Sequence, residues 1–541
     1  MRFDRFGTAL LTGAAAAAFA TANAHAQVRP DTARADTSHA GMHHPVPADP
    51  SHAGMHHPIP PDTSHPRLGH PMPADSPHAR LDHPAPPPAA DSHAGHAMQG
   101  MRMPGDTTPR ALQPAGLHDA MSGVRHAGMR HEMLMRELGG GWQLLGMAQA
   151  FAMTTFAAPR DPGHPLHDTE SYLTQPAAMV NVLSPGARFA LRSTLNLEAI
   201  TQPDGEITFG GWGEGYIDRR HPHTFLHEAM LSLNAWNAGG GALSLSGGKG
   251  FAAYGTDDPM SRPVAKYPTN HHLSQILERW TVNGAYTRGP WSAEASLFSG
   301  AEPEGPWDLG NFGGFGESFS ARVIRRFGGM GTTAPWELGA SFGSVSEPHE
   351  GTTERTRLYN ATIRHSGAHS FGGIYAMAEG SLSDPGHGDG FWSLLGETQV
   401  RIGRHRPYSR VEYATRPEYA RLGALGTPEF YRYDHDEEPV GAARWLIGSL
   451  GYEYDLSGGG AATRPYIEVQ HGRVRAERGG IDPDALLGGH TLWSVSAGFR
   501  LFFGGGPMRM GTYGVMDDMT LMHHPMDGMA GMNMNASEAR H

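Results

Sequence analysis

Alternation of apolar and polar residues with a period of two is the feature that most constrains the fold of this chain. It recurs across residues 142–503 in segments of about ten residues, which are separated by turn-forming Gly, Pro, Asp and Asn. In one segment, Trp291 and Leu297 fall on one face and Glu294 falls on the other. This is the period of a β-strand with one apolar and one polar face, so the region is predicted to be all-β.

Two architectures contain many short alternating strands, namely a soluble sandwich or propeller and a transmembrane barrel. Tyr and Trp cluster near the segment ends, as in aromatic girdles, and the polar faces carry Arg, Glu, Asn and Ser suited to a wet lumen. We therefore predict a transmembrane antiparallel β-barrel of about sixteen strands, with about fourteen or eighteen as open alternatives. An even number places both chain ends on the periplasmic side.

The last alternating segment has a further feature of such barrels. Residues 496–503 contain Gly498, then apolar residues at alternate positions, and end at Phe503. This pattern resembles the C-terminal strand of bacterial outer-membrane barrels, in which a phenylalanine usually ends the protein. Here residues 504–541 follow, so we expect a barrel at residues 139–503 and an additional Met/His-rich tail.

The N-terminus has the pattern of a secretory signal. Arg2 and Arg5 precede an alanine-rich apolar stretch, and small residues lead to Ala26, after which we expect cleavage. Residues 1–26 are therefore predicted to be a signal peptide. The chain has no cysteine, which excludes a disulfide framework and a thiolate zinc site.

Residues 27–138 are predicted to form a disordered, metal-binding arm. The octapeptide Ser-His-Ala-Gly-Met-His-His-Pro occurs at residues 38–45 and 51–58, and weaker copies keep its thirteen-residue spacing. The arm has few aromatic or β-branched residues and cannot bury enough apolar surface to offset its ordering entropy. A short helix is expected at residues 131–138.

Both tails combine histidine with methionine. Neutral imidazole is the commonest side-chain metal ligand and thioether sulfur favours Cu(I), so the mixture indicates copper before zinc, nickel or silver. The alternative for the C-terminal tail is a flexible apolar segment that contacts a partner, but Leu, Val and aromatic residues are scarce there. The candidate ligands of the tails are His39, His43, His44, His52, His56, His57, Met519, Met522, His523, His524 and Met526.

The predicted barrel contains its own cluster of candidate ligands, formed by His221, His223, His227, His271 and His272. Imidazoles and carboxylates within reach of one another bind Cu(II), Zn or Ni. The structural alternative is that Asp218 makes ion pairs with a neighbouring arginine and that the histidines cap a hairpin. His227 and Glu228 are adjacent and are expected to face opposite sides of a strand, which weakens a joint site.

Common enzyme motifs do not occur in a suitable context. Leu231 stands where a zinc-protease helix needs its second histidine, and there is no nucleophile elbow or phosphate loop. We expect no enzymatic activity, with a barrel hydrolase using Asp218, His221 and His223 as the remaining catalytic alternative. The net charge of −12 and the lack of a basic face argue against a nucleic-acid partner.

The layout of signal, Met/His-rich stretch and barrel resembles outer-membrane copper-resistance proteins of the copper B type. The barrel region is also similar to a family of uncharacterised bacterial outer-membrane barrels with an Asp-x-x-His-Pro-His signature, which matches residues 218–223 here. Residues 270–272 and 302–307 are further matching positions. The position after the signature, where the family usually has one of several polar residues, is Thr224 in this chain. The resemblance implies an outer-membrane barrel, and the layout implies copper.

These observations predict an outer-membrane barrel that binds and sequesters or exports copper in heavy-metal resistance, with its tails in the periplasm. The expected partners are metal ions, outer-membrane lipid and a periplasmic metal-carrier protein. The alternative is a general porin-like or structural barrel whose arms contact other envelope components.

Overall fold

The computed structural model describes most of the chain from Leu134 onward. Most of the predicted arm lies outside the described residues, as does the tail beyond Thr520. The described residues are 134–159, 168–201, 206–207, 217–218, 224–256, 258–300, 303, 306–310, 312–328, 335–349, 352–369, 372–386, 390–418, 440–456, 461–479, 481–504, 509–517 and 520.

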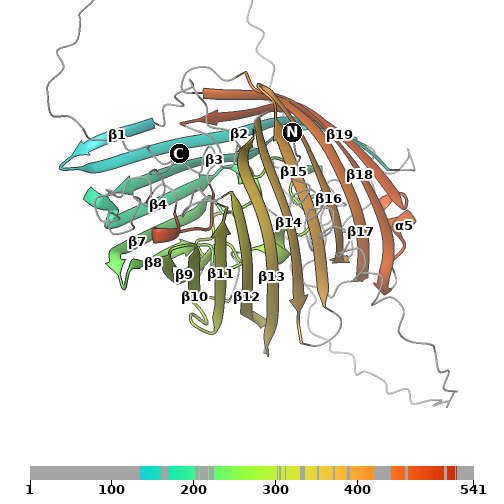
Figure 1. Cartoon of the computed structure of the whole chain (residues 1–541). Coiled ribbons are helices and arrows are strands. Elements are labelled where there is room, and N and C mark those ends of the chain that lie inside the picture. Colours follow the sequence, from blue (N-terminus) through green and yellow to red (C-terminus); the bar gives the residue numbers. More distant parts are fainter. Residues whose placement is uncertain are drawn as a thin grey trace, which may run out of the picture. The chain divides into compact units, whose positions relative to one another are not determined.

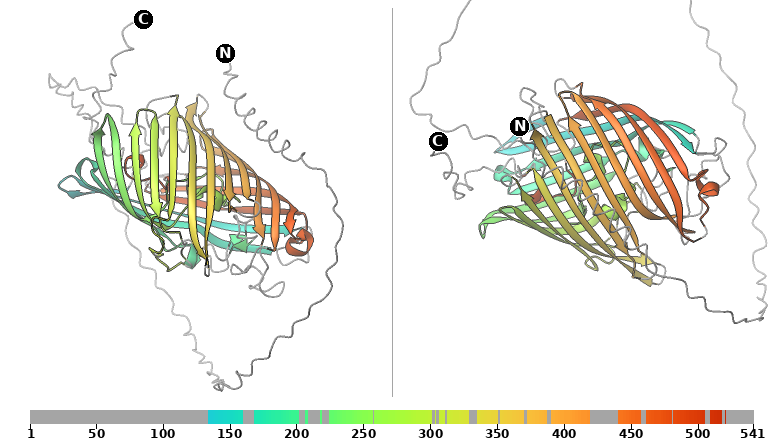
Figure 2. Two further views of the ribbon diagram at one scale, coloured as in Figure 1. Left: turned by 90° about the horizontal axis from the view of Figure 1, so that it is seen from below. Right: turned by 45° about the vertical axis from the view of Figure 1, so that its right-hand side comes forward.

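Sixteen antiparallel strands form one closed barrel, which confirms the predicted fold class and strand number (Figure 1). Each strand pairs with its neighbours in chain order, and the strands run steeply tilted around the barrel (Figure 2). The barrel strands are β2 (Trp142–Pro159), β3 (Asp168–Leu183), β4 (Phe189–Asn196), β7 (Leu226–Ala238), β8 (Gly241–Gly250), β9 (Arg279–Arg288), β10 (Trp291–Phe298), β11 (Ser318–Phe327), β12 (Trp336–His349), β13 (Thr352–His369), β14 (Gly372–Asp384), β15 (Phe391–Arg401), β16 (His405–Glu418), β17 (Gly441–Tyr454), β18 (Ala461–Gly479) and β19 (Thr491–Phe503).

The first and last barrel strands close the ring. β19 pairs with β2 from Leu492↔Pro159 to Phe503↔Ala148, so the last strand ends at the predicted phenylalanine. Beyond that point β2 pairs instead with β1 (Leu134–Gly139). The prediction of a helix at residues 131–138 is therefore wrong for the described residues, which form a strand. Three consecutive glycines with positive φ, at 139–141, turn the chain back so that this strand extends the sheet.

The remaining elements are small and lie in the connections between barrel strands or after β19. β5 (Glu206–Ile207) pairs with β6 (Ile217–Asp218) in a separate two-stranded sheet, so neither of them is a barrel strand. The short helices are η2 (Pro185–Ala187), α3 (Glu198–Thr201), η3 (Pro259–Ser261), α4 (His271–Ser274), α5 (Pro483–Leu487) and η6 (Gly514–Met516). Among the described residues, no helix has the length and apolar character needed to cross a membrane.

The two faces of the barrel have opposite chemistry. On β10, Trp291 and Leu297 are 50% and 49% exposed on the outside, whereas Glu294 and Ser296 are buried on the inside. The same alternation of exposed apolar and buried polar residues recurs on β4, β8, β11 and β19. An apolar exterior around a polar interior is the arrangement of a transmembrane barrel and the reverse of a soluble protein.

The two ends of the barrel differ in the length of their connections. Residues 239–240, 289–290 and 402–404 join strands at what we call the short-turn end, and long connections such as 251–278 leave the strands at the opposite end, called here the long-loop end. β2 begins and β19 ends at the short-turn end. In bacterial transmembrane barrels the short turns face the periplasm.

Candidate functional site: the lumen and its two inserted segments

Paired charges line the barrel lumen. Arg410 Nη2 lies 2.9 Å from Glu397 Oε2, and Arg322 Nε lies 2.6 Å from Glu294 Oε2. All four side chains are buried, and burying a charge without a partner is costly, so the inward faces depend on this pairing. Further buried pairs of the wall are Arg406–Asp455, Arg416–Glu418 and Arg500–Glu453.

Residues 251–278, which connect β8 to β9 and are called here the inner loop, fold into the lumen. The loop contains η3 and α4, and most of its described residues are buried. It leaves the wall between β8 and β9, yet its side chains and backbone contact β14, β16, β18 and β19. The inner loop therefore crosses the lumen to the opposite wall.

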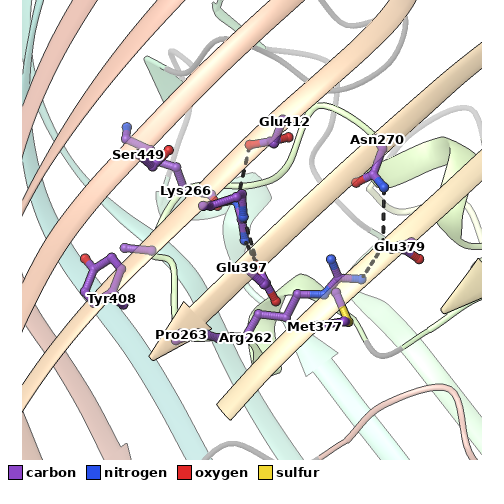
Figure 3. Close-up of polar contacts among 12 residues, drawn as sticks. Arg262, Pro263, Lys266, Asn270, Met377, Glu379, Glu397, Tyr408, Glu412 and Ser449 are labelled. Carbon is purple, nitrogen blue, oxygen red and sulfur yellow. Dashed lines mark hydrogen bonds and ion pairs between the residues drawn. The ribbon is translucent and has the colours of Figure 1, made fainter. Parts of the chain in front are cut away.

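Glu379 of β14 is the principal anchor of the inner loop. Its carboxylate accepts hydrogen bonds from Thr256 Oγ1 at 2.9 Å and from Asn270 Nδ2 at 3.3 Å. Arg262 Nη2 lies 3.5 Å from the same carboxylate. Figure 3 shows Arg262 and Asn270 converging on Glu379 from the loop. One wall residue thus fixes three points of the loop.

Other wall side chains hold the loop backbone. Glu412 and Glu468 accept hydrogen bonds from the backbone N–H groups of Thr269 and Ala265, at 2.6 and 3.1 Å. Arg500 donates to the carbonyl oxygen of Pro263 at 2.6 Å. Pro263, Ala265 and Thr269 are buried, so these side chains satisfy backbone groups that would otherwise be costly to bury.

A second segment enters the lumen after the last strand. Residues 509–517, called here the inner tail, include η6 and are buried throughout. Arg509 Nη2 lies 2.9 Å from Glu337 Oε1, and Asp517 Oδ1 lies 2.5 Å from Arg192 Nη2. Charge-assisted contacts at both ends therefore dock this segment onto the barrel wall.

The inner tail and the inner loop meet inside the barrel. The Tyr513 hydroxyl donates to Glu228 Oε2 at 2.8 Å and accepts from the Phe251 backbone N–H at 3.0 Å. Burial and the neighbouring Glu228 raise the pKa of Tyr513 well above its usual value, which keeps the hydroxyl protonated as a donor. Gly511 has a φ of +76°, and a Cβ there would lie 3.3 Å from the Phe251 ring. The two segments thus fit closely together.

His227 lies in this buried polar region. Its Nδ1 is 2.6 Å from Glu278 Oε1 at the end of the inner loop, and its Nε2 is 4.0 Å from Asp258 Oδ2. Burial raises the pKa of the Asp258 carboxyl, against the opposing effect of His227. The imidazole therefore links β7 to the end of the inner loop through Glu278 and lies close to a second loop carboxylate, Asp258.

The prediction that His227 and Glu228 face opposite sides is wrong. Both side chains are fully buried. The reason is a β-bulge, because Thr194 pairs with Glu228 whereas Leu195 pairs with Leu226, which leaves His227 as an extra residue. A bulge re-aims the side chains next to it, so both point inward here.

His271 and His272 lie together in α4 of the inner loop. The His271 ring stacks on Tyr267 with centroids 5.0 Å apart, and it contacts the His272 ring edge-on at 5.0 Å. In the part of the chain that the structure describes, no group of three or more His, Asp or Glu is arranged to hold a metal ion.

The other predicted ligands all lie outside the described residues, so the tail sites and the histidine cluster of the barrel stay predictions. These residues are His39, His43, His44, His52, His56, His57, His221, His223, Met519, Met522, His523, His524 and Met526.

The side chains that anchor the inner loop were not singled out from the sequence. Glu379 and Glu412 look like ordinary polar positions of alternating strands. One available signal was the length of residues 251–278, because long connections without strand pattern are uncommon in compact domains and are often functional.

The chain has weak similarity to several solved outer-membrane proteins. No family model matches the chain, and no curated protein matches it. Among solved structures, OmpT of Vibrio cholerae is 11% identical, with a TM-score of 0.38 over 67% of this chain and 100% of that chain. The anion-selective porin of Comamonas acidovorans is 11% identical, with a TM-score of 0.37 over 67% and 99%. OprB of Pseudomonas putida is 12% identical, with a TM-score of 0.38 over 67% and 94%.

Proposed function

We propose that the protein is an outer-membrane channel of restricted conductance for small hydrophilic solutes or ions. The observation that carries the proposal is the crossing of a charged lumen by the inner loop. Arg, Glu and Asn side chains hold the loop, and polar contacts of this kind suit a passage for water-soluble molecules better than a sealed apolar core. The inner tail narrows the same lumen from the short-turn end.

Replacing Glu379 with alanine is expected to increase the single-channel current and its fluctuations. The change removes the acceptor shared by Thr256, Arg262 and Asn270, so the inner loop loses its main attachment to β14. Single-channel recording in planar bilayers measures the effect. The matched control is Asp384→Ala on the same strand, because its pair with Arg357 is exposed. Identical currents in both variants would contradict an anchoring role.

A second candidate function, copper sequestration, is favoured by the sequence of the tails. The inner tail is docked in the barrel, and Thr520 beside it donates to Asp517 at 3.1 Å. From there the chain continues into the Met- and His-rich residues 521–541. Many weak ligands on tethered tails give a high effective ligand concentration and fast exchange, as a copper buffer or a relay to a periplasmic carrier requires. Zinc, nickel and silver are the alternative cargoes.

The copper proposal predicts a loss of bound copper when the repeat ligands are changed. In the test variant, the six histidines of the two octapeptides become asparagine, which preserves chain length and polarity. We expect a lower copper stoichiometry in equilibrium dialysis of the detergent-solubilised protein. The control is the same number of substitutions at Ser, Asp and Ala positions of the arm. An unchanged stoichiometry in the histidine variant would remove the arm from the proposal.

A further inference from the structure

Two histidines outside the lumen face each other at the short-turn end of β13. His365 Nε2 and His369 Nε2 are 3.2 Å apart. The neighbouring residue on β13, Arg364, points into the lumen and contacts Glu337. Because successive side chains of a strand point to opposite faces, His365 and His369 lie on the outer face of the barrel. Neither histidine belongs to the predicted ligand set, and neither takes part in the contacts of the inner loop or inner tail described above.

The local sequence makes room for this pair. Gly367 stands between the histidines on the same face of the strand, and a Cβ there would lie 3.2 Å from His365 Cε1 and Nε2. Without that Cβ the His365 ring leans along the strand toward His369. The pattern His-x-Gly-x-His therefore brings together two side chains that are four residues apart in an extended strand.

The surroundings fix one ring and leave the other accessible. The His365 ring is 4.5 Å from the Trp336 ring, which itself stacks on Phe327 at 6.0 Å. His365 is 9% exposed, whereas His369 is exposed at the end of the strand. Trp and Phe on the outer face mark the membrane interface. The pair thus lies at the rim of the barrel, where an ion from the aqueous phase reaches His369.

The distance between the two nitrogens fits two ligands of one metal ion. With Zn–N bonds of about 2.0–2.1 Å, a tetrahedral angle places two ligand nitrogens about 3.3–3.4 Å apart and a right angle about 2.9 Å apart. The observed 3.2 Å lies between these values. We propose that His365 and His369 form a site for a divalent transition-metal ion of the zinc or copper class, at the short-turn rim of the barrel.

Two imidazole ligands occupy two positions of a tetrahedral coordination sphere. No third His, Asp or Glu joins the pair among the residues that the structure describes. Water or a ligand from another molecule then completes the sphere, which is the arrangement of an exchangeable site and not of a closed structural one. The inference extends the proposed metal-handling function from the tails to the barrel wall, and it rests on that function only for the identity of the natural cargo.

Zinc-dependent stabilisation of the full-length protein tests the pair. Binding to unstructured segments is the same in folded and unfolded chains and does not change stability, whereas binding to a site formed by the folded barrel does. At a free Zn²⁺ concentration about 100-fold above its dissociation constant, the ratio of folded to unfolded protein in urea is expected to rise about 100-fold. His369→Ala should abolish this increment, and Gly367→Val should reduce it while keeping both imidazoles.

His405→Ala is the matched control. His405 also lies at the short-turn end, but its Nδ1 is 2.6 Å from the Tyr452 hydroxyl and no second histidine faces it among the described contacts. This variant should retain the full zinc increment. A zinc increment that is absent from the wild type, or equal in wild type and His369→Ala, would overturn the proposal and leave the pair as a hydrogen bond between two rings. Copper stoichiometry of the arm variant is measured separately, so either proposal can fail alone.

Discussion

Removal of residues 505–541 is expected to raise the single-channel conductance several-fold. The deletion takes the inner tail out of the lumen, together with its contacts to Glu337, Arg192 and Glu228. It leaves all sixteen barrel strands intact, because β19 ends at Phe503. The loss of a buried segment from a pore widens the cross-section available to ions, and planar-bilayer recording of the purified barrel reads this directly.

Removal of residues 521–541 is the matched control for this deletion. It takes away most of the Met/His-rich tail but keeps the inner tail docked. We expect its conductance to stay near that of the full chain, while its copper stoichiometry falls. If the two deletions give the same conductance, the inner tail does not restrict the lumen.

Replacement of Glu337, whose carboxylate pairs with three arginines, is expected to cause a large loss of unfolding free energy. Glu337 Oε2 is 3.2 Å from Arg326, and Glu337 Oε1 is 3.5 Å from Arg364 and 2.9 Å from Arg509. Glu337→Ala leaves these guanidinium groups close together without their shared counter-charge. Breaking a buried ion pair by removing one partner costs about 3–5 kcal/mol of unfolding free energy. Urea unfolding in detergent micelles measures the loss.

Glu477→Ala provides the comparison for Glu337→Ala. Glu477 contacts Arg444 in a pair whose side chains are 25% and 37% exposed. Exposed pairs contribute about 0–1 kcal/mol because solvent screens them. A similar loss in both variants would show that the cluster around Glu337 is not desolvated.

The alternation of side chains, together with Tyr and Trp near the segment ends, predicted the barrel. It assigned Trp291 and Leu297 to the outer face and Glu294 to the lumen, as the structure has them. It also located the last strand at Phe503. Strand faces are predictable because the period of two is local and each burial choice repeats many times along the chain.

The interior of the barrel was not predictable in the same way. Arg262 of the inner loop meets Glu379, and Arg192 of β4 meets Asp517, across long stretches of sequence. No repeating pattern in the sequence indicates such ion pairs, because they depend on the positions that two distant segments take in the closed barrel. The bulge at His227 is similar, since neither Gly nor Pro marks it and only the pairing of β4 with β7 reveals it.

The most direct test of the account is the environment of single positions on β10. The chain has no cysteine, so single cysteines at Ala293, Ser296 and Leu297 can each carry a nitroxide spin label in lipid vesicles. For spin labels at Ala293 and Leu297 we predict easy access for oxygen and poor access for a water-soluble nickel complex. For the label at Ser296 we predict that the easy access for oxygen is lost. Equal access of the nickel complex to Leu297 and to an exposed loop position would contradict a lipid-facing barrel wall.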